Sequence, residues 1–350
     1  MNYIIRCADE QACLAAQRRW NTVAKPLRSL GSLEDFIVKI AGIQQTADVR
    51  VDRKCALVFC GDHGVVAEGV SQSGSDVTGI VAASIANGSS NVNLMANTVH
   101  ADVFAIDMGM RDKPSDPRIL SYRQGNGTAN MTKGPAMTRA QAENAIEGGI
   151  DAVRCMKNAG YNLIAVGEMG IGNTTAGAAI VSVLMGILPF EVVGRGAGLS
   201  DEGLARKRRA VETAIAVNSP DQSDPIDVLA KVGGFDIAGM TGAFLGGMIH
   251  RIPIVIDGMI SSAAALAAKR ICAQSGDFML ASHLSKETAA KHILAELGLE
   301  AVLHARMGLG EGTGAVALFP LLDMALNVYN SSHTFDNLNM EAYVPLGGKQ

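Results

Sequence analysis

Short apolar runs alternate with longer helical stretches over most of the chain. The runs that predict strands are residues 56–60, 102–106, 162–166, 252–256 and 278–281. Each is apolar along most of its length rather than in every second position, which is typical of a strand buried on both faces. The sequence therefore predicts a doubly wound α/β domain with a mainly parallel, Rossmann-like sheet covered by helices.

The two ends of the chain are helical. Residues 8–24 and 32–46 have the helical period, and Ser32 with Asp35 three residues later predicts a capping-box-like start for the second helix. A further helix is expected from Glu311 to about residue 330, so both ends together are candidates for a small helical cap on the sheet domain. Residues 108–133 are rich in Gly, Pro, Asp and Asn without periodicity, which predicts a long surface loop.

Composition narrows the class of protein. Apolar residues make up 48% of the chain and charged residues 18%, a balance typical of a compact globular fold. The formal net charge of -4 and the aromatic content of 4% argue against a nucleic acid partner. No window holds the roughly 18 consecutive apolar residues of a membrane span, and residues 1–10 do not resemble a signal peptide. We expect a cytoplasmic protein with no membrane partner.

The turn after the third predicted strand is the most informative one. In an open parallel sheet, ligands bind beyond the carboxyl ends of the strands. Gly170 and Gly172 lead there into a helix that begins with Asn173, Thr174 and Thr175. This turn matches neither a P-loop nor the dinucleotide fingerprint, and it is equally consistent with anion binding and with close helix packing.

A second glycine cluster, at 308–314, surrounds a single carboxylate, Glu311. If water is excluded there, burial raises the pKa of that carboxyl group and makes it a general base at neutral pH. The alternative is that Glu311 caps the helix that follows. The spacing alone favours neither role.

Basic residues and histidines are further candidates for binding a phosphate or a metal ion. The run 206–209 is typical of a solvated helix face, although one of its members can turn inward to meet a phosphate. His63 and His283 follow predicted strands, but no neighbouring residue has metal-ligand spacing. We therefore expect structural or hydrogen-bonding histidines and no metal site.

Taken together, these motifs resemble one family, the nicotinate-nucleotide:dimethylbenzimidazole phosphoribosyltransferases (CobT). The resemblance runs nearly end to end. It is carried by KP at 25–26, SLG at 29–31, GDHGV at 61–65, GEMGIGNTT at 167–175, GRG at 194–196, GGFDIA at 233–238, IDG at 256–258, SHLS at 282–285 and GLGEGTG at 308–314.

The resemblance implies an enzyme of cobalamin lower-ligand synthesis. Such an enzyme moves the 5-phosphoribosyl group of nicotinate mononucleotide to a benzimidazole nitrogen, giving α-ribazole 5′-phosphate and nicotinate. The resemblance further implies a homodimer that uses no cofactor. It implies a large α/β domain over about 51–310, which carries the active site, and a small helical domain made of 1–50 and about 311–350.

The resemblance also assigns roles to individual residues. Glu311 matches the general base, and Glu168 matches a second carboxylate near the site. The ribose phosphate is expected on the 170–175 helix start, with Lys207 and Ser285 beside it, and Ser71 and Gly79 match the wall that holds the aromatic base. The full set of expected substrate-binding residues is Gly170, Gly172, Asn173, Thr174, Thr175, Lys207, Asp257, Ser285, Ser71, Gly79, Leu309 and Gly312.

Some positions depart from the family pattern. Residues 72–75 read QSGS where many members have prolines and an aromatic residue, and Gly79 stands where a glutamine is common. A purine or phenolic acceptor is therefore an alternative to dimethylbenzimidazole. A non-catalytic nucleotide-binding relative and a nicotinamide-dependent oxidoreductase are the alternatives from other classes, and the absent dinucleotide fingerprint argues against the latter.

Overall fold

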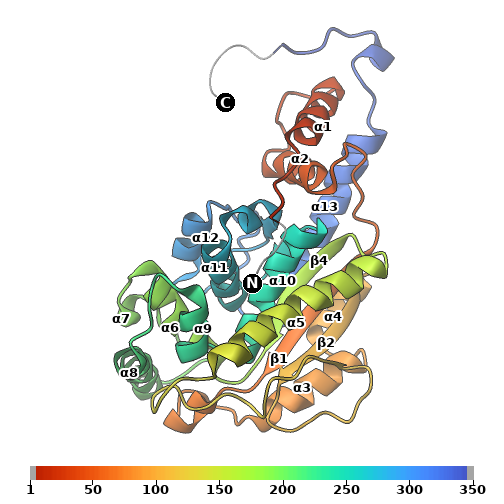
Figure 1. Cartoon of the computed structure of the whole chain (residues 1–350). Helices are drawn as coiled ribbons and strands as arrows, with labels where there is room; N and C mark the ends of the chain where they lie inside the picture. The colour runs from red at the N-terminus through yellow and green to blue at the C-terminus, as the bar shows by residue number, and fades with distance from the viewer. Residues whose placement is uncertain (1–4, 345–350) are drawn as a thin grey trace.

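A six-stranded parallel sheet forms the centre of the molecule (Figure 1). The computed structural model describes residues 5–344. The strand order is β3-β2-β1-β4-β5-β6, so the sheet grows outward in both directions from β1 and β4. The strands are β1 Lys54–Gly61, β2 Asp102–Gly109, β3 Leu120–Ser121, β4 Leu163–Met169, β5 Ile254–Ile256 and β6 Met279–Ala281. The predicted doubly wound α/β fold is confirmed.

The strand β3 corrects the prediction of an uninterrupted loop over 108–133. Leu120 and Ser121 pair in parallel with Ile106 and Asp107 of β2. Two residues cannot display an alternation of buried and exposed positions, so the period of the sequence carries no signal for this strand. The five other strands lie where the apolar runs predict them.

Side chains of β1 alternate between two apolar cores. Leu57 and Phe59 belong to a core shared with α5 to α12, whereas Ala56 and Val58 belong to a core shared with α1 to α4 and α13. Each face of the sheet is thus covered by helices, as fully buried strands require. The helices between the chain ends are α3 Asp76–Ala86, α4 Asn91–Asn97, α5 Arg139–Asn158, α6 Asn173–Met185, α7 Pro189–Val192, α8 Asp201–Asn218, α9 Pro225–Val232, α10 Phe235–His250, α11 Met259–Ile271 and α12 Ala290–Leu297.

The helical ends of the chain pack together beyond one end of the sheet (Figure 1). They comprise α1 Glu10–Thr22, α2 Ser32–Gln44 and α13 Thr313–Ser331. Trp20 of α1 meets Tyr329 of α13 edge to face, with ring centroids 4.9 Å apart. Because their core is continuous with one face of β1, α13 connects this group of helices to the sheet. The boundaries of the two expected domains stay a prediction.

The start of α2 differs from the predicted capping box. The helix does begin at Ser32, but its N-cap is Gly31, and no side chain caps it. Glu34 instead accepts hydrogen bonds from Lys25 Nζ at 2.6 Å and from the Leu30 amide at 2.9 Å, which ties the α1–α2 turn together. The carboxylate that organises this turn is therefore one position before Asp35.

Two structural features bear on the expected partners. None of the helices within residues 5–344 is long and apolar enough to cross a membrane. The same residues hold no group of three or more His, Cys, Asp or Glu side chains arranged to bind a metal ion.

Candidate active site

A cavity of about 290 Å³ lies beyond the carboxyl ends of β4 and β5. Six segments far apart in the sequence line it: the end of β4 with the start of α6, the turn into α11, the turn after β6, the 307–313 loop that leads into α13, Val81 of α3, and the 196–197 loop. Among its lining residues are the predicted Glu168, Gly170, Asn173, Thr174, Asp257, Ser285, Leu309 and Glu311.

A smaller cavity of about 90 Å³ adjoins the first one. Gly170, Asn173 and Thr174 line both cavities, so the two cavities meet at the start of α6. The smaller cavity also brings in the predicted Ser71, Gly172 and Lys207. The two cavities together form an elongated site with carboxylates in one part and a lysine in the other.

Three predicted residues do not line either cavity. Thr175 is fully buried in α6, and Gly312 contributes its backbone amide to a contact with Asp257. Gly79 is exposed on α3, where Val81 of the same helix lines the larger cavity instead. Any contact that Gly79 makes with a substrate is therefore outside the space enclosed by this chain.

Glu311 has the environment of a general base rather than of a helix cap. It has a positive φ of 60°, and its amide donates to the Glu168 carbonyl at 3.2 Å, which places the side chain at the cavity. Its Oε2 atom is buried without a hydrogen-bond partner. Burial raises the pKa of the Glu311 carboxyl group, and the nearby Asp257 charge adds to this, although an interaction with the Val92 backbone opposes it.

Asp257 is the residue that caps α13. Its Oδ1 accepts from the Gly314 amide at 2.7 Å and the Ala315 amide at 3.1 Å, and its Oδ2 accepts from the Gly312 amide at 3.2 Å. Negative charge at a helix N-terminus is stabilising. The alternative interpretation of Glu311 as the cap is therefore wrong, and the Glu311 carboxylate is left free for another role.

Glu168 faces Glu311 from the end of β4. Its side chain is half-buried and accepts a hydrogen bond from Asn173 Nδ2. Burial raises the pKa of Glu168 well above its usual range; the Asn173 hydrogen bond opposes this shift, and the charges of Asp236, Asp257 and Glu311 add to it. A Cβ atom at Gly310 would collide with Glu168 Oε1, so the crowded glycines let the two acidic segments approach closely.

Sequence reasoning did not assign a site role to Asp236. This fully buried carboxylate lies in the first turn of α10 and accepts from Asn173 Nδ2 at 3.3 Å. Its other oxygen lies 3.0 Å from His63 Nε2. Asn173 thus joins Glu168 to a buried acid–histidine pair. The signal was present, since both residues belong to the GGFDIA and GDHGV motifs.

Lys207 is the inward member of the basic run. Its side chain is only 1% exposed, and Nζ donates to Thr174 Oγ1 at 2.8 Å, whereas Arg206 and Arg209 are exposed. Burial lowers the pKa of Lys207 to about 8, and the charge of Glu287 opposes the shift. A buried cation next to a helix N-terminus is suited to a phosphate group.

Comparison with known proteins identifies the family. A family model described as "Phosphoribosyltransferase" matches residues 5–340. The chain is 46% identical over 329 residues to the nicotinate-nucleotide–dimethylbenzimidazole phosphoribosyltransferase of Acetivibrio thermocellus, covering 94% of each chain. It is 44% identical to the enzyme of the same name from Clostridium acetobutylicum, covering 97% of this chain and 96% of that one.

A solved structure agrees with the sequence relatives. The crystal structure of CobT from Thermus thermophilus superposes with a TM-score of 0.90 and 38% identity, over 95% of this chain and 99% of that one. The expected resemblance is thereby confirmed over nearly the whole length. The chain belongs to the phosphoribosyltransferase family whose curated members carry the name nicotinate-nucleotide–dimethylbenzimidazole phosphoribosyltransferase.

Proposed function

We propose that this protein transfers the 5-phosphoribosyl group of nicotinate mononucleotide to a nitrogen of dimethylbenzimidazole, as the names of its relatives indicate. The products are α-ribazole 5′-phosphate and nicotinate. The observation that carries the proposal is the pairing of Glu311 and Glu168 in one cavity, which adjoins a second cavity containing Lys207.

In the proposed reaction, Glu311 is the general base. A bond forms between the benzimidazole nitrogen and the anomeric carbon as the bond to nicotinate breaks. The nicotinate ring nitrogen keeps the bonding electrons and becomes neutral, so its departure needs no acid. The proton of the azole N–H goes to Glu311, whose unpartnered Oε2 and raised pKa suit this task.

Glu168 and the smaller cavity have supporting roles in the proposed reaction. The second carboxylate lies in the same cavity as Glu311, where it can assist the reaction or position the substrate. The phosphate is expected next to Lys207 and Thr174, at the start of α6. Binding energy from this remote phosphate holds the reacting carbon in line with its two partners.

An apolar wall supports an aromatic acceptor. Val81, Ile171, Met259 and Leu309 line the larger cavity, and Leu309 is 55% exposed, so it lies at the mouth. Apolar pockets with a few convergent polar groups are typical of sites that bind flat heterocycles. The wall contains no aromatic side chain among the residues that the structure describes around this cavity, which suits a ring held by aliphatic contacts.

The remaining properties of the proposed enzyme follow from the family. We expect a cytoplasmic homodimer that works without a metal or organic cofactor, with a small domain of 1–50 and about 311–350 next to a large one of about 51–310. Light scattering of the purified protein measures the subunit number. Chelation by EDTA is expected to leave turnover unchanged.

Nicotinate release from nicotinate mononucleotide tests the proposed function directly. Purified protein is supplied in turn with dimethylbenzimidazole, benzimidazole, adenine and phenol, and the ribosylated product is identified by mass spectrometry. We expect the fastest release with dimethylbenzimidazole. Faster release with adenine or phenol would overturn the proposed acceptor, and no release with any of the four would overturn the reaction.

A further inference from the structure

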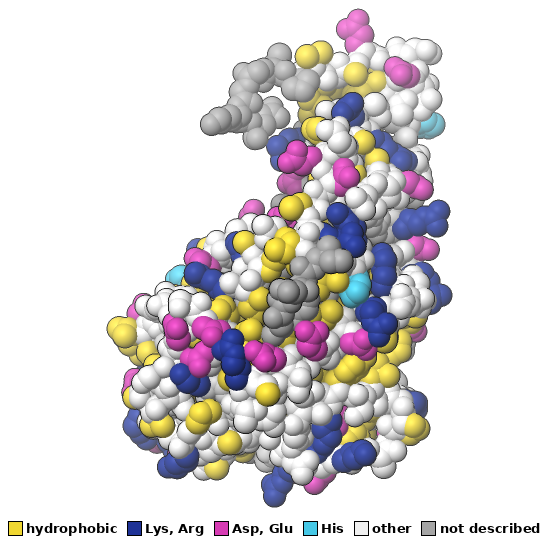
Figure 2. Space-filling model, viewed as in Figure 1, with side chains coloured by type: hydrophobic (Ala, Val, Ile, Leu, Met, Phe, Trp, Pro, Cys, Tyr) yellow, Lys and Arg dark blue, Asp and Glu magenta, His cyan; other side chains and the backbone are white. Residues whose placement is uncertain are grey.

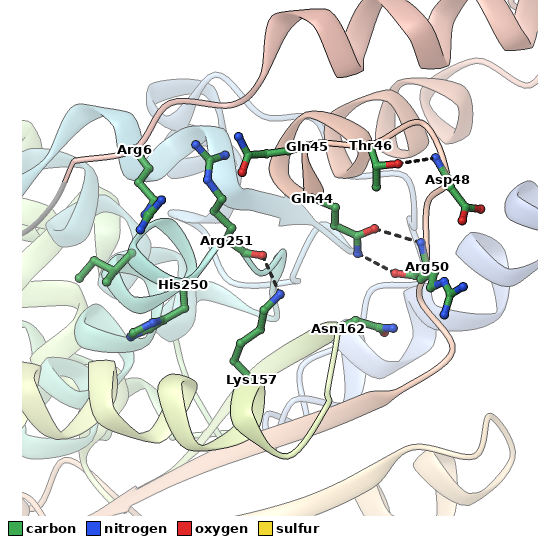
Figure 3. A pocket seen from close by; sticks show the side chains of 11 residues that line it. Arg6, Gln44, Gln45, Thr46, Asp48, Arg50, Lys157, Asn162, His250 and Arg251 are labelled. Atoms are coloured by element: carbon green, nitrogen blue, oxygen red, sulfur yellow. Dashed lines mark hydrogen bonds between the residues drawn. The ribbon is translucent and has the colours of Figure 1, made fainter.

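A second large cavity, of about 630 Å³, lies at the opposite edge of the sheet (Figure 3). Its walls come from the segment before α1, the end of α2 with the residues after it, the end of α5, and the end of α10. The lining also includes Asn162, immediately before β4. None of these residues takes part in the site described above.

The length of β4 separates this cavity from the proposed active site. Asn162 precedes the first residue of β4, and Glu168 lies at its other end. Six residues of extended strand span about 20 Å. A ligand of ordinary size in one cavity therefore cannot reach the other.

Positive charge dominates the lining. Arg6, Arg50, Lys157 and Arg251 line it together with the titratable His250, whereas Asp48 is the one carboxylate among the lining residues. Within residues 5–344, none of the four cations forms an ion pair with a carboxylate. On the face seen in Figure 2, basic side chains (dark blue) gather beside the helical ends, with a histidine (cyan) among them.

Several of the donors in this cavity are buried and have no partner. Arg6 Nε, His250 Nε2, and both Nε and Nη1 of Arg251 make no hydrogen bond and are shielded from solvent. A buried polar group without a partner is costly, and in native proteins most such groups are satisfied. Figure 3 shows Arg6, Arg251 and His250 close together on one side of the cavity. These donors lack an acceptor within the described chain.

The ends of the helices explain only part of this arrangement. The carboxyl ends of α5 and α10 attract cations, and Lys157 Nζ does donate to the Arg251 carbonyl at 3.2 Å. That contact leaves Nε and Nη1 of Arg251 without a partner among the described residues. Burial lowers the pKa of His250. The positive charges of Arg154, Arg6 and Lys157 lower it further, and the Asp151 charge opposes the shift. The electrostatic field at His250 therefore disfavours one more cation. The same field favours an anion.

We propose that this cavity, which we call the basic cavity, binds a small phosphate compound that carries two or more negative charges. Guanidinium groups form paired hydrogen bonds to phosphate oxygens, and an ammonium group adds a point charge. Gln45 and Asn162 also line the cavity, and the Asn162 amide donates to Asp52 Oδ1 at 2.7 Å. The volume is in the range of pockets that hold nucleotide-sized ligands and exceeds what a bare ion requires. This inference does not depend on the proposed reaction.

Calorimetric titration of the full chain in a phosphate-free buffer tests this inference. The probes are pyrophosphate, AMP and, as a dicarboxylate of similar charge, succinate. Pyrophosphate and AMP distinguish a simple phosphate anion from an organic one. Since the active site also binds phosphate in the proposed function, each titration is repeated with Lys207→Ala, which leaves the basic cavity as the remaining phosphate site.

Two variants remove charge from the basic cavity. Arg251 has a φ of 51°, a conformation that asparagine tolerates, so Arg251→Asn removes the guanidinium with little backbone strain. Arg6→Ala acts in the segment before α1 and alters no helix. The matched control is Arg209→Ala, an exposed arginine on α8 outside the cavity. We expect binding at least about 10-fold weaker with Arg251→Asn, weaker to a smaller extent with Arg6→Ala, and unchanged with the control.

A spectroscopic readout locates the bound probe. Because a nearby anion favours the protonated imidazole, saturating pyrophosphate is expected to raise the pKa of His250 measured by NMR. Turnover without added probe should be the same in Arg251→Asn, Arg6→Ala and the parent.

Four results would overturn the proposal. The first is equal affinity of the parent, Arg251→Asn and Arg6→Ala for pyrophosphate and for AMP. The second is no binding of either probe to Lys207→Ala. The third is succinate binding as tight as pyrophosphate binding. The fourth is a change in subunit number with Arg251→Asn and no change in probe affinity, which would identify the basic cavity as a contact between protein chains.

Discussion

The two edges of the central sheet carry opposite charge. At the carboxyl edge, Glu168, Asp236, Asp257 and Glu311 lie close together. At the amino edge, arginine, lysine and histidine side chains surround a cavity that contains one carboxylate. The same strand, β4, ends at the first and begins at the second.

The two edges also differ in how their charges are satisfied. In the acidic site, backbone amides hold both oxygens of Asp257, and Asn173 holds one oxygen each of Glu168 and Asp236. Among the described residues, Glu311 Oε2 and Asp236 Oδ1 have no hydrogen-bond partner. Among residues 5–344, four buried nitrogens at the basic cavity have no hydrogen-bond partner. Burial raises the pKa of a carboxyl group and hydrogen bonds to its charged form lower that pKa, whereas unpaired cations attract an anion.

The largest effect is expected from Glu311→Gln. The amide keeps the shape of the side chain but cannot accept a proton, so turnover should fall by about 10²-fold or more, the usual scale for a general base. Nicotinate release at saturating substrates measures it. Binding of nicotinate mononucleotide should be nearly unchanged, because the proposed phosphate site is the other cavity. A large loss of nucleotide affinity at normal turnover would assign Glu311 to binding.

Gly310→Ala tests the close approach of the two acidic segments. Gly310 has a φ of +87°, and the new methyl group would collide with the Glu168 carboxylate. We expect turnover about 10-fold lower together with a loss of stability of about 1–2 kcal/mol for the left-handed backbone. Gly298→Ala is the matched control, since Gly298 has a φ of +69° in open space. Equal turnover loss in both variants would show that backbone strain alone is responsible.

Lys207→Ala tests whether the smaller active-site cavity binds the phosphate while the larger one holds the reacting groups. Loss of a buried, charge-assisted contact of about 1.5–3 kcal/mol should weaken nicotinate mononucleotide binding by about 10- to 100-fold, with a smaller effect on turnover at saturation. Titration calorimetry with the nucleotide measures the change. Arg209→Ala, an exposed change in the same basic run, should bind as the parent does. Unchanged affinity in Lys207→Ala would exclude Lys207 from the phosphate site.

The smallest effect concerns stability and its dependence on pH. Burial raises the pKa of Glu168, so the folded state binds this proton more tightly than the unfolded state does. Ionisation of the half-buried Glu168 destabilises the folded state. This loss of stability is absent below the unfolded-state pKa of about 4.3, and it grows as the pH rises toward the folded-state pKa. Glu168→Gln should therefore raise Tm more at pH 7 than at pH 4. Thermal unfolding at both values checks this; an equal shift would show that Glu168 is not destabilised by ionisation.

Sequence patterns predicted what depends on local periodicity and on family motifs. The five longer strands, the helical ends and the residues of the acidic site all carry such a signal. The capping of α13 by Asp257 and the two-residue strand β3 do not, because each depends on contacts between distant segments. The charge pattern of the basic run alone does not show which of its four members turns inward; the family resemblance singles out Lys207, and the packing of α8 buries it. The basic cavity combines residues from five separate segments, none of which forms a motif.

The central claim, that Glu311 is the base, is tested most directly by the pH dependence of one ratio. Nicotinate release by the parent is divided by that of Glu311→Gln at each pH, so that any titration of the substrates cancels. The account predicts a ratio that approaches one at low pH and rises with pH, with a midpoint above the usual pKa of a glutamate because burial raises that of Glu311. A ratio that stays constant over this range would contradict the assignment of Glu311 as the base.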